Sequence, residues 1–564
     1  AKTHDSSPLA TTREGVFVAG AFQGPKDIPE SVMQGSAAAA EAAALLANAR
    51  NTLIKEKKYP EERDVEGEEP RIGVFICHCG INIGAYVNVP EVVEYAKKLK
   101  YVVYAEDNLY TCSQDTQNRI KEIIKEKKLN RVVVASCTPR THEPLFQETL
   151  KDAGLNPYLF EMANIREQCS WIHMSSREEA TQKAKDLVRM AVAKAAHLFP
   201  LKEMYLDVNQ SALVIGGGVA GMTAALEIAK GGYDVFIVEK EKELGGMLKE
   251  IYYTTWSDDM QAFLASLKNQ VRNHERITIY TGAEVEKIDG FVGQYKTTIK
   301  QGSKRKTIEH GVIILATGSE GYKPKEYMYG KDKRVVTQHE LEEMIANNKI
   351  DPKSLKRVVM IQCVGSRNDE HPYCSRICCT QAMKNAKKLL QKNPKLQLFV
   401  LNKDIRTYGF REKWYNDVRD MGGIFIRYTD EKKPEVVKEG DRLVVKAFDP
   451  EIQDWIEIPV DLLVLSTGVV PRSENHEMAK LLKVPLNEDG FFLEAHVKLR
   501  PVDFATEGVF LAGSAHSPKF VEESIIQAKA AAARAQTIIS KPKYRAGLGN
   551  YGLCPGRCGL CLNY

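Results

Sequence analysis

Cysteines are the residues of this 564-residue chain whose type and spacing best suit redox or metal chemistry. In a reduced intracellular chain, grouped cysteines more often hold metal than form disulfides. The twelve cysteines form three groups: Cys77, Cys79, Cys112, Cys137 and Cys169; Cys363, Cys374, Cys378 and Cys379; and Cys554, Cys558 and Cys561. Each group is a candidate metal site, and the elements around it decide what it can hold.

The second group has the pattern of an iron-sulfur site. A strand expected at residues 356–362 runs into Cys363, and Cys378 and Cys379 stand where a helix should start. With Cys374 they offer four thiolates, one for each iron of a [4Fe-4S] cube. Zinc is a rival, although zinc sites usually have paired CxxC knuckles. Redox-active or merely buried cysteines are a further alternative, and the pattern favours the cluster.

The first group lies at the ends of predicted strands. Apolar strands expected at residues 72–76, 101–105 and 131–135 alternate with helices at 90–98 and 116–127. The carboxyl ends of parallel strands converge on one crevice, so the spacing predicts a second metal site there. Its expected ligands are Cys77, Cys79, Cys112 and Cys137. Cys169 is either a fifth candidate or a buried helical thiol.

The third group offers three ligands and needs a fourth thiolate from elsewhere. Three interpretations stay open: a cluster completed by another cysteine, a place at a subunit interface, or a truncated end. The three residues are Cys554, Cys558 and Cys561.

A glycine-rich turn predicts dinucleotide binding. An apolar strand enters Gly216, Gly218 and Gly221, and a helix at residues 222–230 follows. These glycines permit a tight turn, close approach to a pyrophosphate and close packing of helix on strand. Glu239 ends the next strand, where an acid suits a ribose hydroxyl pair. The alternative is a glycine-rich turn that binds nothing.

Further turns favour FAD over NAD. Ala316-Thr317-Gly318 and Ser466-Thr467-Gly468 resemble the ATG turns of FAD-dependent pyridine-nucleotide-disulfide oxidoreductases. The unit at Gly513 resembles the closing flavin motif of that superfamily, with Ser514 in place of its usual Asp. The resemblance implies FAD, and the remaining residues assigned to its site are Val219, Ala220, Lys240, Gly246 and Met247.

The closing flavin motif occurs twice. Residues 14–40 return as residues 507–533, with matching Gly, Pro, Lys, Gln and Ala positions at a constant offset. Each copy predicts a short strand, a loop and an Ala-rich helix, whereas the opening glycine-rich unit occurs only once. We interpret residue 1 as lying inside a longer polypeptide that held two related modules. A rearranged single module is the alternative.

The motif CVGSRN…YCSRICC resembles the A subunit of heterodisulfide reductase, and the similarity runs from about residue 71 to residue 541. The resemblance implies FAD beside a [4Fe-4S] cluster and flavin-based electron bifurcation or confurcation in an anaerobic multi-subunit complex. Lys384 matches a family lysine that approaches the reactive edge of the flavin, and a solvated helix lysine is the other interpretation. The implied partners are ferredoxin, hydrogenase or dehydrogenase adaptor subunits, and subunits like the B and C subunits of heterodisulfide reductase.

The expected fold is α/β, a two-dinucleotide-binding-domain flavoprotein like thioredoxin reductase with an additional N-terminal α/β domain and iron-sulfur sites. The expected divisions are a tail of a preceding FAD module (1–54), a linker (55–70), a Cys-containing α/β domain (71–205), the first part of the FAD domain (206–320), an inserted nucleotide-type domain with the cluster (321–459), the second part of the FAD domain (460–541) and a Cys-rich tail (542–564).

Composition excludes some classes of function. Lys and Arg number 79 against 74 Asp and Glu, and the basic residues are dispersed, so no nucleic-acid partner is expected. No apolar run reaches the roughly 18 residues of a membrane span and no signal peptide is evident, which predicts a cytoplasmic protein. The resemblance to the A subunit of heterodisulfide reductase implies a hetero-oligomer or a dimer.

Two other functions compete with an electron-transfer role. An NAD(P)H-dependent disulfide reductase needs a glycine fingerprint near residue 360 and a CxxC or CxxxxC pair, and the sequence has neither. A non-catalytic scaffold that keeps flavin and clusters for folding or docking is the second alternative. The terminal electron acceptor is not specified by the sequence.

Overall fold

The computed structural model describes residues 2–4, 6–257 and 259–549, and the side chains of residues 6–257 and 259–547. The chain forms two compact units. Of the described residues, the larger unit contains those up to 52 and those from 206 to 544, and the smaller unit contains residues 53–205 and 545–549. The predicted α/β class is confirmed. None of the helices in the described ranges combines the length and apolar character needed to cross a bilayer.

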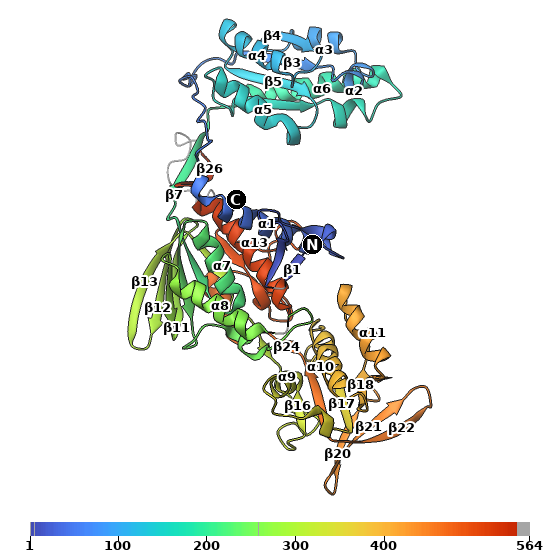
Figure 1. Ribbon diagram of the computed structural model, residues 1–564. Helices are drawn as coiled ribbons and strands as arrows, with labels where there is room; N and C mark the ends of the chain where they lie inside the picture. The colour runs from blue at the N-terminus through green and yellow to red at the C-terminus, as the bar shows by residue number, and fades with distance from the viewer. Residues whose placement is uncertain (1, 5, 258, 550–564) are drawn as a thin grey trace. The chain divides into compact units, whose positions relative to one another are not determined.

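The first sheet of the larger unit is a parallel dinucleotide-type sheet with strand order β10-β9-β8-β14-β25. Alternate residues of its strands face opposite layers. One face packs against helices α7, α8 and α13, and the other packs against an antiparallel sheet of β11, β12 and β13 (Figure 1). The bounds are β8 Ser211–Ile215, β9 Asp234–Glu239, β10 Ile277–Thr281, β14 Val312–Leu315, β25 Val509–Leu511, α7 Val219–Lys230, α8 Met260–Asn273, α13 Val521–Ile539, β11 Ala283–Phe291, β12 Gln294–Gln301 and β13 Lys304–His310.

The second sheet of the larger unit is also parallel, with strand order β16-β23-β17-β18-β19. Helices α9, α10 and α11 pack on one side, and an antiparallel sheet of β20, β21 and β22 packs on the other. The bounds are β16 Val335–Thr337, α9 Gln338–Ala346, β17 Arg357–Val364, α10 Cys378–Lys392, β18 Gln397–Asn402, α11 Glu412–Asp420, β19 Ile424–Arg427, β20 Glu435–Glu439, β21 Arg442–Asp449, β22 Asp454–Val460 and β23 Leu462–Thr467.

The expected end of the inserted domain at residue 459 is too early. Strand β23 begins at Leu462 and pairs with both β16 and β17, so it lies inside the second sheet. The sequence of an apolar run at a domain boundary does not indicate which of the two sheets the strand joins.

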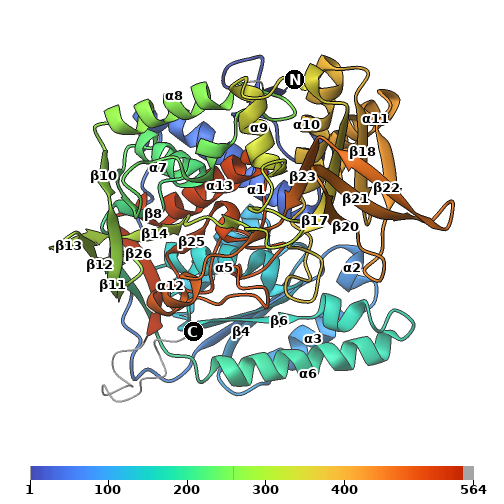
Figure 2. The same ribbon diagram turned by 90° about the horizontal axis from the view of Figure 1, so that it is seen from below.

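The N-terminal segment of the larger unit consists of β2 (Ser7–Thr11), a loop and α1 (Ile28–Leu45), preceded by β1 (Lys2–His4). The strand expected just after Glu14 is absent: that stretch makes only an isolated antiparallel bridge between Phe17 and Ala10. A capping box of Asp27 and Glu30 starts α1. Helix α1, in blue, lies beside α13, in red (Figures 1 and 2).

The smaller unit has a four-stranded parallel sheet, β4-β3-β5-β6. The three expected strands are present, and β6 was not expected from the sequence. Residues 55–70, expected as a linker, form no helix or strand, but Val65 is buried in the core of this unit. The bounds are β3 Ile72–Cys77, α3 Val89–Ala96, β4 Val102–Asn108, α4 Gln114–Glu126, β5 Arg131–Ser136, α5 Pro139–Asp152, β6 Phe160–Asn164 and α6 Arg177–Ala195.

Candidate cofactor cavity and cysteine loop

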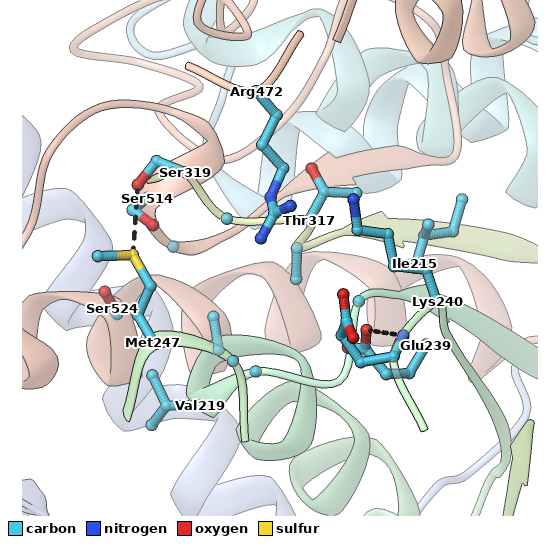
Figure 3. Close-up of a pocket in the computed structure, with 18 of the residues that line it drawn as sticks. Ile215, Val219, Glu239, Lys240, Met247, Thr317, Ser319, Arg472, Ser514 and Ser524 are labelled. Carbon is cyan, nitrogen blue, oxygen red and sulfur yellow. Dashed lines mark hydrogen bonds between the residues drawn. The ribbon is translucent and has the colours of Figure 1, made fainter. Parts of the chain in front are cut away.

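A cavity of about 370 Å³ lies at the carboxyl ends of the first sheet of the larger unit. Its wall combines the glycine-rich turn after β8, the end of β9, the turn after β14 and the turn after β25 (Figure 3). The sequence-predicted residues in the wall are Gly216, Gly218, Val219, Ala220, Glu239, Lys240, Gly246, Met247, Ala316, Thr317, Gly318, Gly513 and Ser514. The predicted residues Gly221 and Gly468 do not line it.

The glycine-rich turn is built by close packing. A Cβ on Gly216, whose φ is +109°, would lie 2.3 Å from the carbonyl oxygen of Ala316, and one on Gly221 would lie 1.8 Å from that of Gly216. A Cβ on Gly218 would instead meet only the Gly246 Cα, at 3.9 Å. The first two glycines therefore bring β8, β14 and α7 together, and Gly218 leaves the positive end of α7 open toward the cavity.

The Glu239 carboxylate is fixed at the end of β9. The Gly217 N–H donates to its Oε2 at 2.6 Å, and the Glu241 N–H donates to its Oε1 at 2.8 Å. The side chain is buried and forms part of the cavity wall. These two hydrogen bonds hold an acceptor where a sugar hydroxyl of a bound dinucleotide would need one.

Several polar wall residues were not found from the sequence. Arg472, His339 and Lys519 line the cavity, and burial lowers the pKa of Lys519 to about 8. The buried Thr317 Oγ1 has no hydrogen-bond partner among the described residues, so it is free to bond a ligand. Only Lys519 had a signal in the sequence, because it belongs to the repeated motif and matches Lys26.

The cysteine loop replaces the glycine-rich turn in the second sheet. Cys363 occupies the end of β17, and α10 begins at Cys378. Between these elements, Cys363, Arg367 and Arg376 all have φ near +60°, a conformation that side chains rarely adopt. The loop thus accepts backbone strain at non-glycine positions, which is common where a loop must present particular side chains.

The four cysteines of this loop lie near enough for the charges of three of them to act on the fourth, Cys378. Burial raises the pKa of Cys378 strongly, and the negative charges of Cys379, Cys363 and Cys374 raise it further. Burial likewise raises the pKa of Cys379 to about 12. Burial and mutual repulsion keep Cys363, Cys378 and Cys379 from ionising together unless cations are bound. No three His, Cys, Asp or Glu side chains of the described part are arranged to hold a metal ion.

Ile377 connects the cysteine loop to the cavity. This residue immediately precedes Cys378, and it is part of the cavity wall together with Val469. The Tyr373 hydroxyl of the same loop donates to the Val469 carbonyl at 3.0 Å. The loop that carries the cysteines therefore forms part of the cavity wall.

Lys384 lies in α10, on the C-terminal side of Cys378 and Cys379, and its side chain is buried. Its Nζ donates to the Tyr253 carbonyl at 2.6 Å and pairs with Glu342 Oε2 at 2.7 Å. Burial lowers the pKa of Lys384, and the negative charge of Glu342 opposes this. The solvated interpretation is therefore wrong. Lys384 does not line the cavity, but Glu342 lies close enough to the wall residue His339 to raise its pKa against the lowering by burial.

In the smaller unit, three of the four predicted ligands lie together. Backbone N–H groups of Cys79 and Thr111 donate to Cys77 Sγ at 3.2 and 3.4 Å. The Arg166 guanidinium lies 3.6 Å from Cys79 Sγ and also lowers the pKa of Cys137, which burial raises.

The remaining cysteines differ from that set. Cys112 is exposed, whereas Cys169 is buried and its thiol donates to the Ala180 carbonyl at 3.1 Å. The predicted third group, Cys554, Cys558 and Cys561, lies outside the described residues.

Comparison with known proteins decides the family. Residues 210–361 match the pyridine nucleotide-disulphide oxidoreductase family. The second iron-sulfur A subunit of CoB–CoM heterodisulfide reductase from Methanopyrus kandleri is 40% identical, over 88% of this chain and 90% of its own. The chain belongs to the family of heterodisulfide reductase A subunits.

A second relative is the A subunit of H2:CoB–CoM heterodisulfide,ferredoxin reductase from Methanothermobacter marburgensis. It is 38% identical, over 89% of this chain and 90% of its own. Among solved structures, a T. acidophilum thioredoxin reductase matches with a TM-score of 0.41 and 18% identity, over 58% of this chain and 98% of that one. The resemblance found in the cysteine loop is confirmed, and the chain is a flavoprotein oxidoreductase of this family.

Proposed function

We propose that the cavity of the larger unit binds FAD and that the neighbouring cysteine loop binds a [4Fe-4S] cluster. When bound, FAD supplies two-electron exchange and the cluster supplies one-electron exchange. The amide groups at the start of α7 and the open side of Gly218 fit a diphosphate. Glu239 would accept hydrogen bonds from a ribose, and the unpaired Thr317 hydroxyl would bond a further polar group.

The cluster proposal rests on Ile377, which belongs both to the cysteine loop and to the cavity wall. Residues 363–379 carry four cysteines, and Ile377, between Arg376 and Cys378, lines the cavity. Arg367 Nη1 lies 4.0 Å from Cys363 Sγ, and the Arg376 N–H donates to Cys374 Sγ at 3.4 Å. Such donors stabilise thiolate charge and tune the potential of a bound cluster.

Lys384 stands behind the cavity wall. We assign it a proton on Nζ, held between Glu342 and the Tyr253 carbonyl, so that it acts on the cavity through Glu342 and His339. In the smaller unit, Cys77, Cys79, Cys112 and Cys137 would hold a second cluster, with Arg166 as a cationic neighbour.

The chain would then serve as an electron-transfer subunit that bifurcates electrons between partners. The name of the Methanothermobacter marburgensis relative includes ferredoxin and heterodisulfide. It supports ferredoxin and a heterodisulfide-reducing protein as the partners of this chain. Hydrogenase or dehydrogenase adaptor subunits are the expected electron donors.

Anaerobic purification tests the cofactors. Iron, acid-labile sulfide, zinc and flavin are measured per chain. One FAD and roughly four irons with equal sulfide would support the cavity and the cysteine loop, and roughly eight or twelve irons would add the other cysteine groups. Zinc without sulfide would overturn the cluster, and protein without flavin would overturn the cavity assignment.

Electron transfer needs a separate test in the intact complex. Reduced ferredoxin is mixed with the complex, and bleaching of the flavin absorbance and reduction of the partner protein are followed over time. A Cys378→Ala chain should still bind FAD but pass electrons to the partner much more slowly. Equal partner reduction by both chains, or none by either, would contradict the electron-transfer role and favour a scaffold.

A further inference from the structure

The N-terminal segment folds as a second copy of the closing unit of the flavin domain. In the second copy, Phe510 bridges Asp503 and the Leu511 N–H donates to the Val502 carbonyl at 2.8 Å. In the first copy, at the equivalent positions, Phe17 bridges Ala10 and the Val18 N–H donates to the Leu9 carbonyl at 2.9 Å. The two copies therefore share these backbone bridges and hydrogen bonds as well as their sequence pattern.

The match continues through the turn and into the helix. The φ angles of the equivalent Gly20 and Gly513 are +70° and +74°, and each glycine begins a 3-10 turn. A glutamate at the third helical position, Glu30 in α1 and Glu523 in α13, accepts from the backbone N–H at the helix start. These two glutamates lie 3.9 and 3.3 Å from the same Arg376 guanidinium.

The two copies differ in what covers them. Ile28, Phe22 and Leu46 of the first copy are 58%, 95% and 62% exposed. Their equivalents in the second copy are Val521, Ala515 and Ile539, at 9%, 0% and 0%, buried against the first sheet and its helices. The residues remain apolar in a place where nothing in the described structure covers them, which marks an interaction surface.

The equivalent glycines Gly513 and Gly20 also differ in what lies against them. A Cβ on Gly513 would lie 2.7 Å from the Ala220 Cβ of α7, so the turn packs closely on the opening unit. A Cβ on Gly20 would meet only Ser31, at 3.8 Å. The absence of a side chain at Gly20 would therefore allow a helix like α7 to approach closely.

We infer that residues 14–46 are a docking surface for a second flavin-type dinucleotide-binding domain, one that lacks a closing unit of its own. That domain would lay the edge of its sheet against residues 16–18, as β14 pairs with β25 in this chain. Gly20, Ala21 and Lys26 would then close its FAD cavity, since their equivalents Gly513, Ser514 and Lys519 line the cavity here. A second copy of this chain already has that sheet edge paired with β25, so it is the wrong occupant.

Helix pairing sets the geometry of the resulting assembly. Gln34, Ala37 and Ala40 of α1 are buried, and Ala37 belongs to the core that contains α13. The equivalent face of α13 includes the buried Gln527 and Ala530. Two flavin modules would therefore meet through the equivalent Ala-rich helices α1 and α13.

Photo-crosslinking in the native complex tests the surface without requiring bound flavin, so its outcome is independent of the FAD assignment. A benzophenone amino acid replaces Phe22, and in a control chain it replaces Phe291, which is 51% exposed on β11. Position 22 should crosslink to a peptide from a glycine-rich opening unit on another polypeptide segment, and position 291 should not. Crosslinks only to another type of domain, to residues 211–239 or 312–318 of this chain, or to nothing would overturn the inference.

Charge on the surface gives a second measurement. An Ile28→Asp, Leu46→Asp chain should lose the second flavin domain, with affinity roughly tenfold or more weaker by native mass spectrometry. FAD in the cavity of this chain should be retained. Leu499→Asp, at another exposed apolar position, is the matched control. Equal association of the two variants would contradict the proposal.

Discussion

The two parallel sheets of the larger unit place different chemistry at the same point of the same architecture. In the first, β8 passes through Gly216 and Gly218 directly into α7. In the second, β17 ends with Cys363 and Val364, and a long loop follows before α10 begins at Cys378. A short glycine turn exposes helix amides to an anion, whereas the long loop carries cysteines that can act as metal ligands. In the proposed assignment, the strand-helix frame sets the position of each ligand site, and the connection between strand and helix sets which ligand the site suits.

The largest expected effect comes from filling the glycine turn of the first sheet. In Gly221→Val the new Cβ would lie 1.8 Å from the Gly216 carbonyl, so α7 cannot pack on β8. FAD per purified chain should fall to nearly zero. Gly321→Ala is the control, since its Cβ would meet no atom within 4 Å. Stoichiometric FAD in the valine variant would show that this turn does not build the cavity.

The equivalent change in the second sheet is Cys378→Ala. Loss of one of four ligands should remove roughly four irons per chain and leave FAD bound, because the glycine turn is unchanged. Iron and flavin analysis of anaerobically purified chains measures both. Cys169→Ala is the control, as this buried thiol lies outside the proposed cluster ligands. Unchanged iron in the Cys378 variant would remove the cluster from this loop.

The sequence predicted both sheets because their signals are local. The glycine turn, the strand before Cys363 and the helix start at Cys378 each depend on neighbouring residues, and each is present in the structure. The strand expected at Val16 failed for a non-local reason. A sheet edge like that of β14 stabilises the equivalent Val509, and no such edge pairs with Val16 in the described chain.

Cavity residues from distant segments escaped prediction for the same reason. His339 and Arg472 reach the wall from segments that follow β16 and β23, and no spacing rule connects them to Gly216. Lys384 was found only through family resemblance. Its burial with Glu342 joins two helices that are far apart in sequence, which no local pattern reports.

A smaller effect is expected from the buried pair beside the second sheet. Lys384→Met leaves the fully buried Glu342 without its cation and should lower the free energy of unfolding by about 3–5 kcal/mol. Urea denaturation of the apoprotein measures this. The double variant Lys384→Met, Glu342→Gln should recover part of the loss, and the exposed Lys392→Met should change it by less than about 0.5 kcal/mol. Equal loss in the single and double variants would mean that the two side chains are not energetically coupled.

The smallest expected effect is a pH dependence of FAD affinity at the closing turn of the first sheet. The pKa of Lys519 is about 8 because burial disfavours its charged form, and the side chain lines the cavity. Below pH 8 it carries a positive charge that attracts the FAD diphosphate, and above pH 8 the charge is lost. Affinity measured by flavin fluorescence should therefore fall roughly three- to tenfold between pH 7 and 9.5.

The folded-state pKa of Lys519 lies below its ordinary value of 10.5, so the unfolded chain binds more protons between pH 8 and 10.5. The contribution of Lys519 to the free energy of unfolding thus rises over this range, and loss of FAD there is not unfolding at this site. Lys519→Arg keeps its charge and should hold FAD equally at pH 7 and 9.5, whereas Lys519→Met should bind weakly at both. A methionine variant with the same fall in affinity as the native chain would assign the titration to another wall residue.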